Sequence, residues 1–317
     1  MKRHIFLFAF FTLLATALHP QNQQWSGKLT LPKENWLPAE PIIATLEFTN
    51  NSKTSIPFKW SGDFFIDRNP EACIQKDIPY VSAPPPMPGS VKTKNEIPKE
   101  IPGTIRRIDA NLSRACSKKM EQLYSPGKHE ICIKLKGLKG YYDESCVEYE
   151  IVNPTGVDKQ AYEFIKAQII EPDKWLEQYS EKEEESIRHA VLSKYPTSTY
   201  AGYVLCNGRS QFNDAVGYLQ RAEKSRGERK NCKSEVETLL AQGPRLDTAQ
   251  SYLINGSDFA YYDVLRSIVS WKLALLGKYD ESRTECNKVI ASNKSPIEVE
   301  RCKEFIAYME QKGYLKK

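Results

Sequence analysis

The hydrophobic pattern of this chain changes its period once, at residues 153–156, and this change divides the chain into two parts. Over residues 25–152, apolar and polar side chains alternate and turn residues follow at short intervals. After Gly156, apolar side chains recur at spacings of three and four. Alternation is typical of strands with one buried face, and the wider spacing is typical of helices. The sequence therefore predicts a multidomain protein with an antiparallel β-sandwich at residues 18–154 and an all-α domain at residues 155–317.

The first seventeen residues have the features of a secretory signal peptide. Lys2 and Arg3 give a basic start, residues 5–14 are apolar and uncharged, and Ala15-Thr16-Ala17 supplies the small-x-small cleavage pattern. An apolar run this short does not anchor a chain in a bilayer. We therefore expect residues 1–17 to be removed. The mature chain, with no transmembrane segment, is then expected to be secreted or periplasmic.

The charge of the chain argues against nucleic acid as a partner. Removing Lys2 and Arg3 lowers the formal net charge from +5 to +3. Basic residues in both domains are interleaved with acidic ones, whereas nucleic-acid binding requires a concentrated basic surface.

All eight cysteines lie in the expected mature chain, four in each domain. An even number in each domain of an exported protein favours disulfides within the domains. A metal site is the alternative, but no CxxC or CxxH pair occurs and zinc sites usually have such close spacing. We therefore expect no metal and no cofactor. The disulfide candidates are Cys73, Cys116, Cys132, Cys146, Cys206, Cys232, Cys286 and Cys302.

One of the pairings follows from strand geometry. Alternation over residues 128–136 and 145–152 places Cys132 and Cys146 on the same outward face of two neighbouring strands. A short glycine-containing connection predicts that these strands form a hairpin, so a bridge is geometrically possible. Elimination then leaves Cys73 with Cys116. In the helical domain, Cys206 with Cys232 and Cys286 with Cys302 would each tie nearby helices together.

The β part carries two motifs that lead into predicted strands. They are Leu37-Pro38-Ala39-Glu40-Pro41, before the strand at residues 42–49, and Ser125-Pro126-Gly127-Lys128-His129, which opens the strand at 128–136. On these motifs, residues 25–153 resemble the immunoglobulin-like (macroglobulin-like) modules of exported bacterial proteins. The resemblance implies a fold and no activity. We expect a return strand at residues 56–60 and an inserted loop at residues 69–102.

Two helical segments, residues 211–222 and 277–289, resemble the second helix of a tetratricopeptide repeat. Each has a small residue, Ala215 or Ser282, where two helices would cross closely, and Ala249 lies almost midway between them. The resemblance implies stacked helical hairpins across residues 197–317. An irregular helical bundle is the alternative. Residues 298–313 are expected to form a closing helix.

The sequence lacks two common hydrolase signatures. HExxH and GxSxG are absent, His129 is expected to pack inside the sheet, and His189 is expected on the surface. We therefore expect a protein that is not an enzyme. Paired tyrosines are candidates for contact with a partner. These are Tyr141, Tyr142, Tyr261 and Tyr262.

The leading hypothesis is an exported, non-enzymatic protein-binding or scaffold protein. The tetratricopeptide resemblance implies a helical surface that binds a protein or peptide partner. The alternatives are a cell-envelope hydrolase with a site assembled between the two domains and a carbohydrate-binding module.

Overall fold

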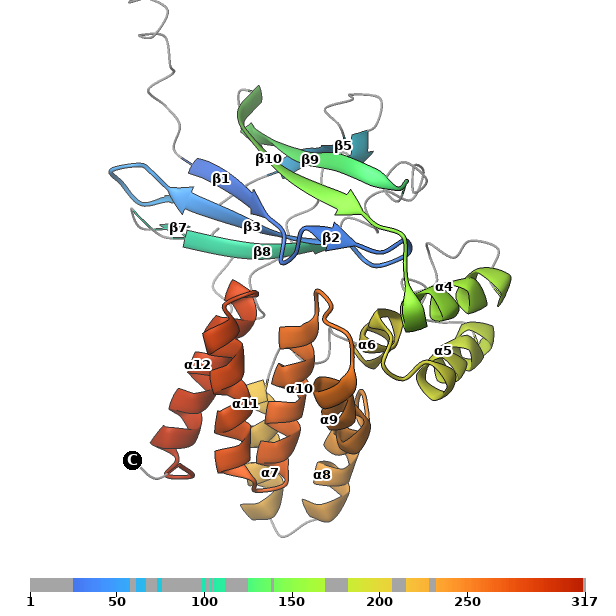
Figure 1. Ribbon diagram of the computed structural model, residues 1–317. Coiled ribbons are helices and arrows are strands. Elements are labelled where there is room, and N and C mark those ends of the chain that lie inside the picture. The colour runs from blue at the N-terminus through green and yellow to red at the C-terminus, as the bar shows by residue number, and fades with distance from the viewer. Residues whose placement is uncertain are drawn as a thin grey trace, which may run out of the picture.

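The computed structural model describes residues 25–57, 61–66, 73–75, 99–100, 103, 105–111, 125–137, 140–168, 182–206, 215–227 and 232–315. The chain combines a β part, formed by the N-terminal residues, with a helical part that follows it (Figure 1). The predicted signal peptide lies outside the described residues. Across the described ranges, the helices are too short or too polar to cross a membrane.

The described β strands form two larger sheets and one short ribbon. The first sheet is antiparallel and contains, in spatial order, β1 (Trp25–Thr30), β3 (Ile43–Asn50) and β8 (Ile105–Asn111). The second sheet contains, in spatial order, β2 (Asn35–Trp36), β10 (Gly140–Ile151), β9 (Gly127–Gly137), β5 (Ser61–Ile66) and β6 (Cys73–Gln75). Only β2 runs parallel to its neighbour among these pairs. The ribbon contains β4 (Ile56–Pro57) and β7 (Lys99–Glu100).

The two larger sheets meet where β1 lies against β10 (Figure 1). The backbone N–H of Leu29 donates a 2.9 Å hydrogen bond to Oγ of Ser145 at this contact. In β3, the side chains of Ala44, Leu46 and Phe48 are fully buried, as the alternation predicts. The apolar face of this strand therefore forms part of the core of the β part.

The strand pairing differs from the sequence prediction in two places. The return strand expected at residues 56–60 does not pair with β3, because β1 and β8 occupy both sides of β3. Its described residues form β4, which pairs with β7. Residues 69–102 are not wholly a loop, because they include β6 and β7, which pair with β5 and β4. Short polar strands such as these carry too weak an alternation to be recognised from sequence.

The described helices follow β10 in chain order. They are α4 (Gly156–Gln168), α5 (Lys182–Lys194), α6 (Thr199–Leu205), α7 (Ala215–Gly227), α8 (Cys232–Ala241), α9 (Leu246–Asn255), α10 (Tyr262–Leu275), α11 (Tyr279–Ser292) and α12 (Pro296–Gln311). The central element is α10, which contacts α6, α7, α8, α9, α11 and α12. All its residues from Ile268 to Leu275 are buried, as expected of a helix enclosed on every side.

Local sequence explains how the last three helices are arranged. Gly277 adopts a φ of +79°, which L side chains rarely do, and this turn reverses the chain between α10 and α11. Ser282 is fully buried and its Oγ lies 3.0 Å from Oγ of Ser270, so small residues mark the close contact of these two helices. Ser295 caps α12 by accepting a hydrogen bond from the N–H of Glu298, and Pro296 follows at the first turn.

The β part and the helical part share one apolar core. Ala39 and Ile43 belong to the same cluster of buried side chains as those of α6, α9 and α10. The hydroxyl of Tyr200 in α6 donates a 2.8 Å hydrogen bond to the carbonyl of Pro38. The motif at residues 37–41 therefore forms the contact between the two parts, in addition to leading into β3.

Candidate functional site

A shallow cavity of about 490 Å³ opens on the helical part, between α5, α6 and α9. We call it the α9 groove. It combines apolar side chains with hydroxyl, amide and carboxylate groups, the mixture usual in ligand-binding sites. Its lining residues are Leu192, Pro196, Thr197, Leu205, Asp247, Thr248, Ser251, Tyr252 and Asn255.

The helix α9 presents one continuous face to this groove. Its lining residues fall at positions 247, 248, 251, 252 and 255, which is the three- and four-residue spacing of a single helix face. Ile254 lies two turns after Asp247 on nearly the same side of the helix. Ile254 is 80% exposed, so the helix that lines the groove also carries a solvent-exposed aliphatic group.

The floor of the groove is fixed by the ring of Tyr252. Its hydroxyl lies 3.0 Å from the carbonyl oxygen of Ser198 and 2.9 Å from that of Ser257. A Cβ on either Gly202 or Gly256 would come within 2.6 Å of the Tyr252 side chain, so only glycine fits beside this ring. Burial raises the pKa of Tyr252, so its hydroxyl stays protonated and acts as a hydrogen-bonding anchor rather than as a base.

A second cluster of functional groups lies between the two parts, and we call it the Glu40 junction. Glu40 is fully buried, and its carboxylate accepts hydrogen bonds from the N–H of Leu37 (2.8 Å) and the hydroxyl of Tyr203 (2.6 Å). It also forms an ion pair with Lys33. Burial, followed by the charge of Glu40, raises the pKa of Tyr203 well above its usual value. Both oxygens of the carboxylate are engaged, which suits a structural contact better than acid–base chemistry.

The predicted contact tyrosines lie in different settings. Tyr261 and Tyr262 are half-buried beside the groove helices. The Tyr261 ring packs edge-on against that of Tyr203, with centroids 5.5 Å apart, and the Tyr262 hydroxyl donates a 2.6 Å hydrogen bond to the carbonyl of Leu253. Tyr141 and Tyr142 lie in β10, where their side chains are outside the described part. A partner-contact role for these four residues stays a prediction.

His129 and His189 do not line the α9 groove. The ring of His129 packs against that of Tyr149, with centroids 5.3 Å apart, and its Nε2 lies 2.8 Å from the carbonyl oxygen of Ser125. His189 is exposed on α5. His189 therefore has the expected surface position, whereas His129 is half-buried and not part of the core.

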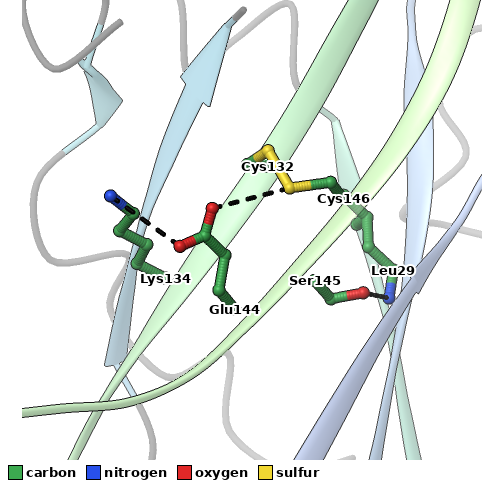
Figure 2. The surroundings of a disulfide bond; sticks show 6 residues. All are labelled: Leu29, Cys132, Lys134, Glu144, Ser145 and Cys146. Atoms are coloured by element: carbon green, nitrogen blue, oxygen red, sulfur yellow. Dashed lines mark hydrogen bonds and ion pairs between the residues drawn. A yellow bond between two sulfur atoms is a disulfide. The ribbon is translucent and has the colours of Figure 1, made fainter. Parts of the chain in front are cut away.

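The predicted disulfide between Cys132 and Cys146 is confirmed, and the two residues lie directly opposite each other in β9 and β10 (Figure 2). Cys132 is nevertheless fully buried, which corrects its predicted outward placement, because β9 lies inside its sheet between β10 and β5. Glu130 is close enough to suggest a metal site, but sulfurs joined in a disulfide are not thiolate ligands. Because Cys146 is in the disulfide, it has no thiol proton to donate. The 3.6 Å distance between its Sγ and Oε1 of Glu144, marked in Figure 2, is therefore a contact and not a hydrogen bond.

Among the described side chains, the predicted bridge between Cys286 and Cys302 is not formed. Both residues are buried thiols, which corrects the expectation that they are already paired. The thiol of Cys206 lies 3.8 Å from the carbonyl oxygen of Tyr261, which accounts for its orientation. Cys232 begins α8 and Cys73 begins β6, but their side chains, like the whole of Cys116, lie outside the described part.

Comparison of the chain with family models, curated proteins and solved structures finds no match.

The residues of the α9 groove are not marked by any pattern in the sequence. Four polar residues on one face of α9 are typical of any solvated helix, so their pattern alone does not mark a site. The useful signal was Ile254, an aliphatic residue on that polar face. The cavity itself depends on how α5 and α6 pack against α9, which local sequence does not encode.

Proposed function

We propose that this chain is an exported, non-enzymatic binding or scaffold protein that holds an extended peptide segment of a partner protein in the α9 groove. The observation that carries the proposal is an open cavity lined by one face of α9 together with an 80% exposed Ile254 on the same helix. An exposed aliphatic side chain beside a concave surface is a common feature of interaction sites.

The chemistry of the groove suits a peptide. Leu192 and Leu205 offer an apolar wall for one aliphatic side chain of the peptide. Thr248, Ser251 and Asn255 are exposed and carry hydroxyl and amide groups that can exchange hydrogen bonds with a peptide backbone. The carboxylate of Asp247 is paired with Arg245, at 2.7 Å, so the charge at this end of the groove is already balanced.

The fold assignments form part of the same proposal. Two sheets in contact at β1 and β10 support the immunoglobulin-like sandwich, and the buried Ser282 at the contact of α10 with α11 supports a tetratricopeptide-like hairpin. Because α10 is enclosed by neighbouring helices, we place the binding surface in the α9 groove rather than on a concave repeat face.

Export is supported by two independent features. The first is the signal-peptide pattern of residues 1–17. The second is the disulfide between Cys132 and Cys146, since such bonds persist in oxidising compartments such as the periplasm or the extracellular space.

A displayed library of random peptides tests the binding proposal, with the mature chain, residues 18–317, as bait. The whole mature chain is required because its two parts share a core. Selected peptides are then measured against Ser251→Arg, which fills the groove, and against the matched control Asn287→Arg on the exposed surface of α11. We expect affinity to fall at least about tenfold, or about 1.4 kcal/mol, for the groove variant alone.

Hydrogen exchange adds a positional test of the same complex. A bound peptide is expected to slow exchange in α9 and at the end of α5. Selected peptides that bind both variants equally, or that protect only the β part, would place the binding surface elsewhere and overturn the proposal for the groove.

A further inference from the structure

The last two described helices, α11 and α12, lie side by side and each carries one buried cysteine (Figure 1). Cys286 is 1% exposed and Cys302 is 3% exposed. Both thiols face α10, where Oγ of Ser270 lies 2.9 Å from Sγ of Cys286 and Oγ of Ser267 lies 3.6 Å from Sγ of Cys302.

The two serines show that the thiols converge. Ser267 and Ser270 are three residues apart on α10, which makes them neighbours on one face of that helix. Because each thiol contacts one of these two serines, Cys286 and Cys302 lie against the same stretch of α10 from neighbouring helices.

The surroundings of the two thiols make them chemically unequal. Interaction with Cys302 lowers the pKa of Cys286, whereas interaction with Cys286, together with burial, raises the pKa of Cys302. The thiolate is the nucleophile in disulfide exchange. Cys286 is therefore the residue that attacks first, and Cys302 is the one that resolves the mixed disulfide.

We propose that Cys286 and Cys302 form a thiol–disulfide pair, which closes into a bridge between α11 and α12 when a small-molecule or protein disulfide supplies the oxidant. The Cys286 thiolate attacks one sulfur of the oxidant and forms a mixed disulfide, and the other sulfur leaves as a thiol after taking up a proton. Cys302 then loses its proton and attacks the Cys286 sulfur, which releases the second thiol. Two protein thiols are oxidised to one disulfide, and the oxidant disulfide is reduced to two thiols.

The position of α12 gives this bridge a structural consequence. The helix contacts α7, α10, α11 and β8, and the hydroxyl of Tyr308 donates to the carboxylate of Glu223 in α7 at 2.9 Å. A bridge to α11 would fasten the last helix to the bundle and indirectly to the β part. Because both thiols are buried, we expect oxidation to be fast during folding and slow in the folded protein.

The experiment uses the mature chain refolded from urea in a buffer of oxidised and reduced glutathione. After denaturation and alkylation, non-reducing digestion is expected to yield a peptide pair that links Cys286 to Cys302 and that dithiothreitol separates. The oxidised protein is expected to have a higher urea midpoint than the reduced protein. The result does not depend on the proposed peptide-binding function.

Single variants distinguish this pair from a chance product of refolding. Cys206→Ser changes a third buried cysteine of the helical part and is expected to leave the linked peptide in place. Cys286→Ser is expected to leave Cys302 alkylated. The proposal is overturned if both cysteines of the unaltered chain are alkylated under the most oxidising glutathione ratio, or if either is linked to a different cysteine.

Discussion

The hydroxyl of Tyr203 donates a 2.6 Å hydrogen bond to Oε1 of Glu40, a residue 163 positions earlier in the chain. The bond joins α6 to the turn that leads into β3, and it lies in the core that both parts share. Hydrogen bonds to a buried carboxylate are among the stronger polar contacts in proteins. The β part and the helical part are therefore expected to unfold together, in one transition.

Tyr203→Phe tests the strength of this connection. The variant leaves a buried carboxylate oxygen without one donor, so we expect the free energy of unfolding to fall by about 1.5–3 kcal/mol. Urea denaturation followed by circular dichroism measures the change. Tyr262→Phe is the matched control, since its hydroxyl donates to the neutral carbonyl of Leu253 and its loss should cost about 1 kcal/mol. If the two variants lower the free energy of unfolding equally, the charge of Glu40 does not strengthen its hydrogen bond with Tyr203.

The same tyrosine predicts how stability changes at high pH. Burial raises the pKa of Tyr203 in the folded state, whereas an unfolded tyrosine ionises at about pH 10. Below that pH both states keep the proton, so this residue contributes no pH dependence. Above it, the unfolded state releases the proton and the folded state does not, so the free energy of unfolding falls as pH rises. Urea titrations at about pH 9 and 11 should show a smaller fall in Tyr203→Phe than in the unaltered protein.

The elements with strong periodicity were predictable from the sequence. The β9–β10 hairpin and its bridge between Cys132 and Cys146 followed from alternation, because a two-residue period fixes which side chains share a face. The helical spacing of apolar residues after Gly156 likewise predicted the first helix of the helical part. This helix is α4, and its Ala161 and Ile165, four residues apart, are buried.

Features that depend on long-range packing were not predictable. The pairing of β3 with β8 joins segments about sixty residues apart, for which the chain carries no local signal. The shared core was missed for the same reason: residues 37–41 indicated a lead into a strand, and nothing in them showed that Pro38 and Glu40 contact α6. The α9 groove likewise required the positions of three helices.

Gly202→Ala tests the tight packing beneath the α9 groove. A Cβ at this position would lie 2.6 Å from the hydroxyl oxygen of Tyr252 and 2.8 Å from Cε1 of Phe259. Both rings are buried, so they cannot move aside freely, and we expect a loss of about 1–3 kcal/mol in the free energy of unfolding. Combining it with Tyr252→Leu should cost less than the sum of the two single changes. Strict additivity in urea denaturation would contradict the predicted clash.

Lys272 predicts an opposite pH dependence at moderately alkaline pH. Its side chain is 1% exposed, and its Nζ donates to the carbonyls of Leu240 (2.7 Å) and Pro244 (2.6 Å). Burial lowers the pKa of Lys272 to about 8, against about 10.4 for an unfolded lysine. Between these values the unfolded state binds more protons, so this residue makes the free energy of unfolding rise with pH. In Lys272→Met, the free energy of unfolding should no longer rise between these pH values. In Lys288→Met, which changes an exposed lysine of α11, the rise should remain.

Removing the bridge between Cys132 and Cys146 should destabilise the β part and the helical part together. The two cysteines are 14 residues apart, and closing a loop of about this length stabilises a fold by about 3 kcal/mol through the restricted unfolded chain. The double variant Cys132→Ala and Cys146→Ala keeps the apolar surroundings of β9, so most of its cost should come from the lost bridge. Since the parts share a core, urea denaturation of this variant should show one transition at a lower midpoint, with sheet and helix signals changing together. Two separate transitions would show that the contacts of Glu40 and Pro38 with α6 do not couple the two parts.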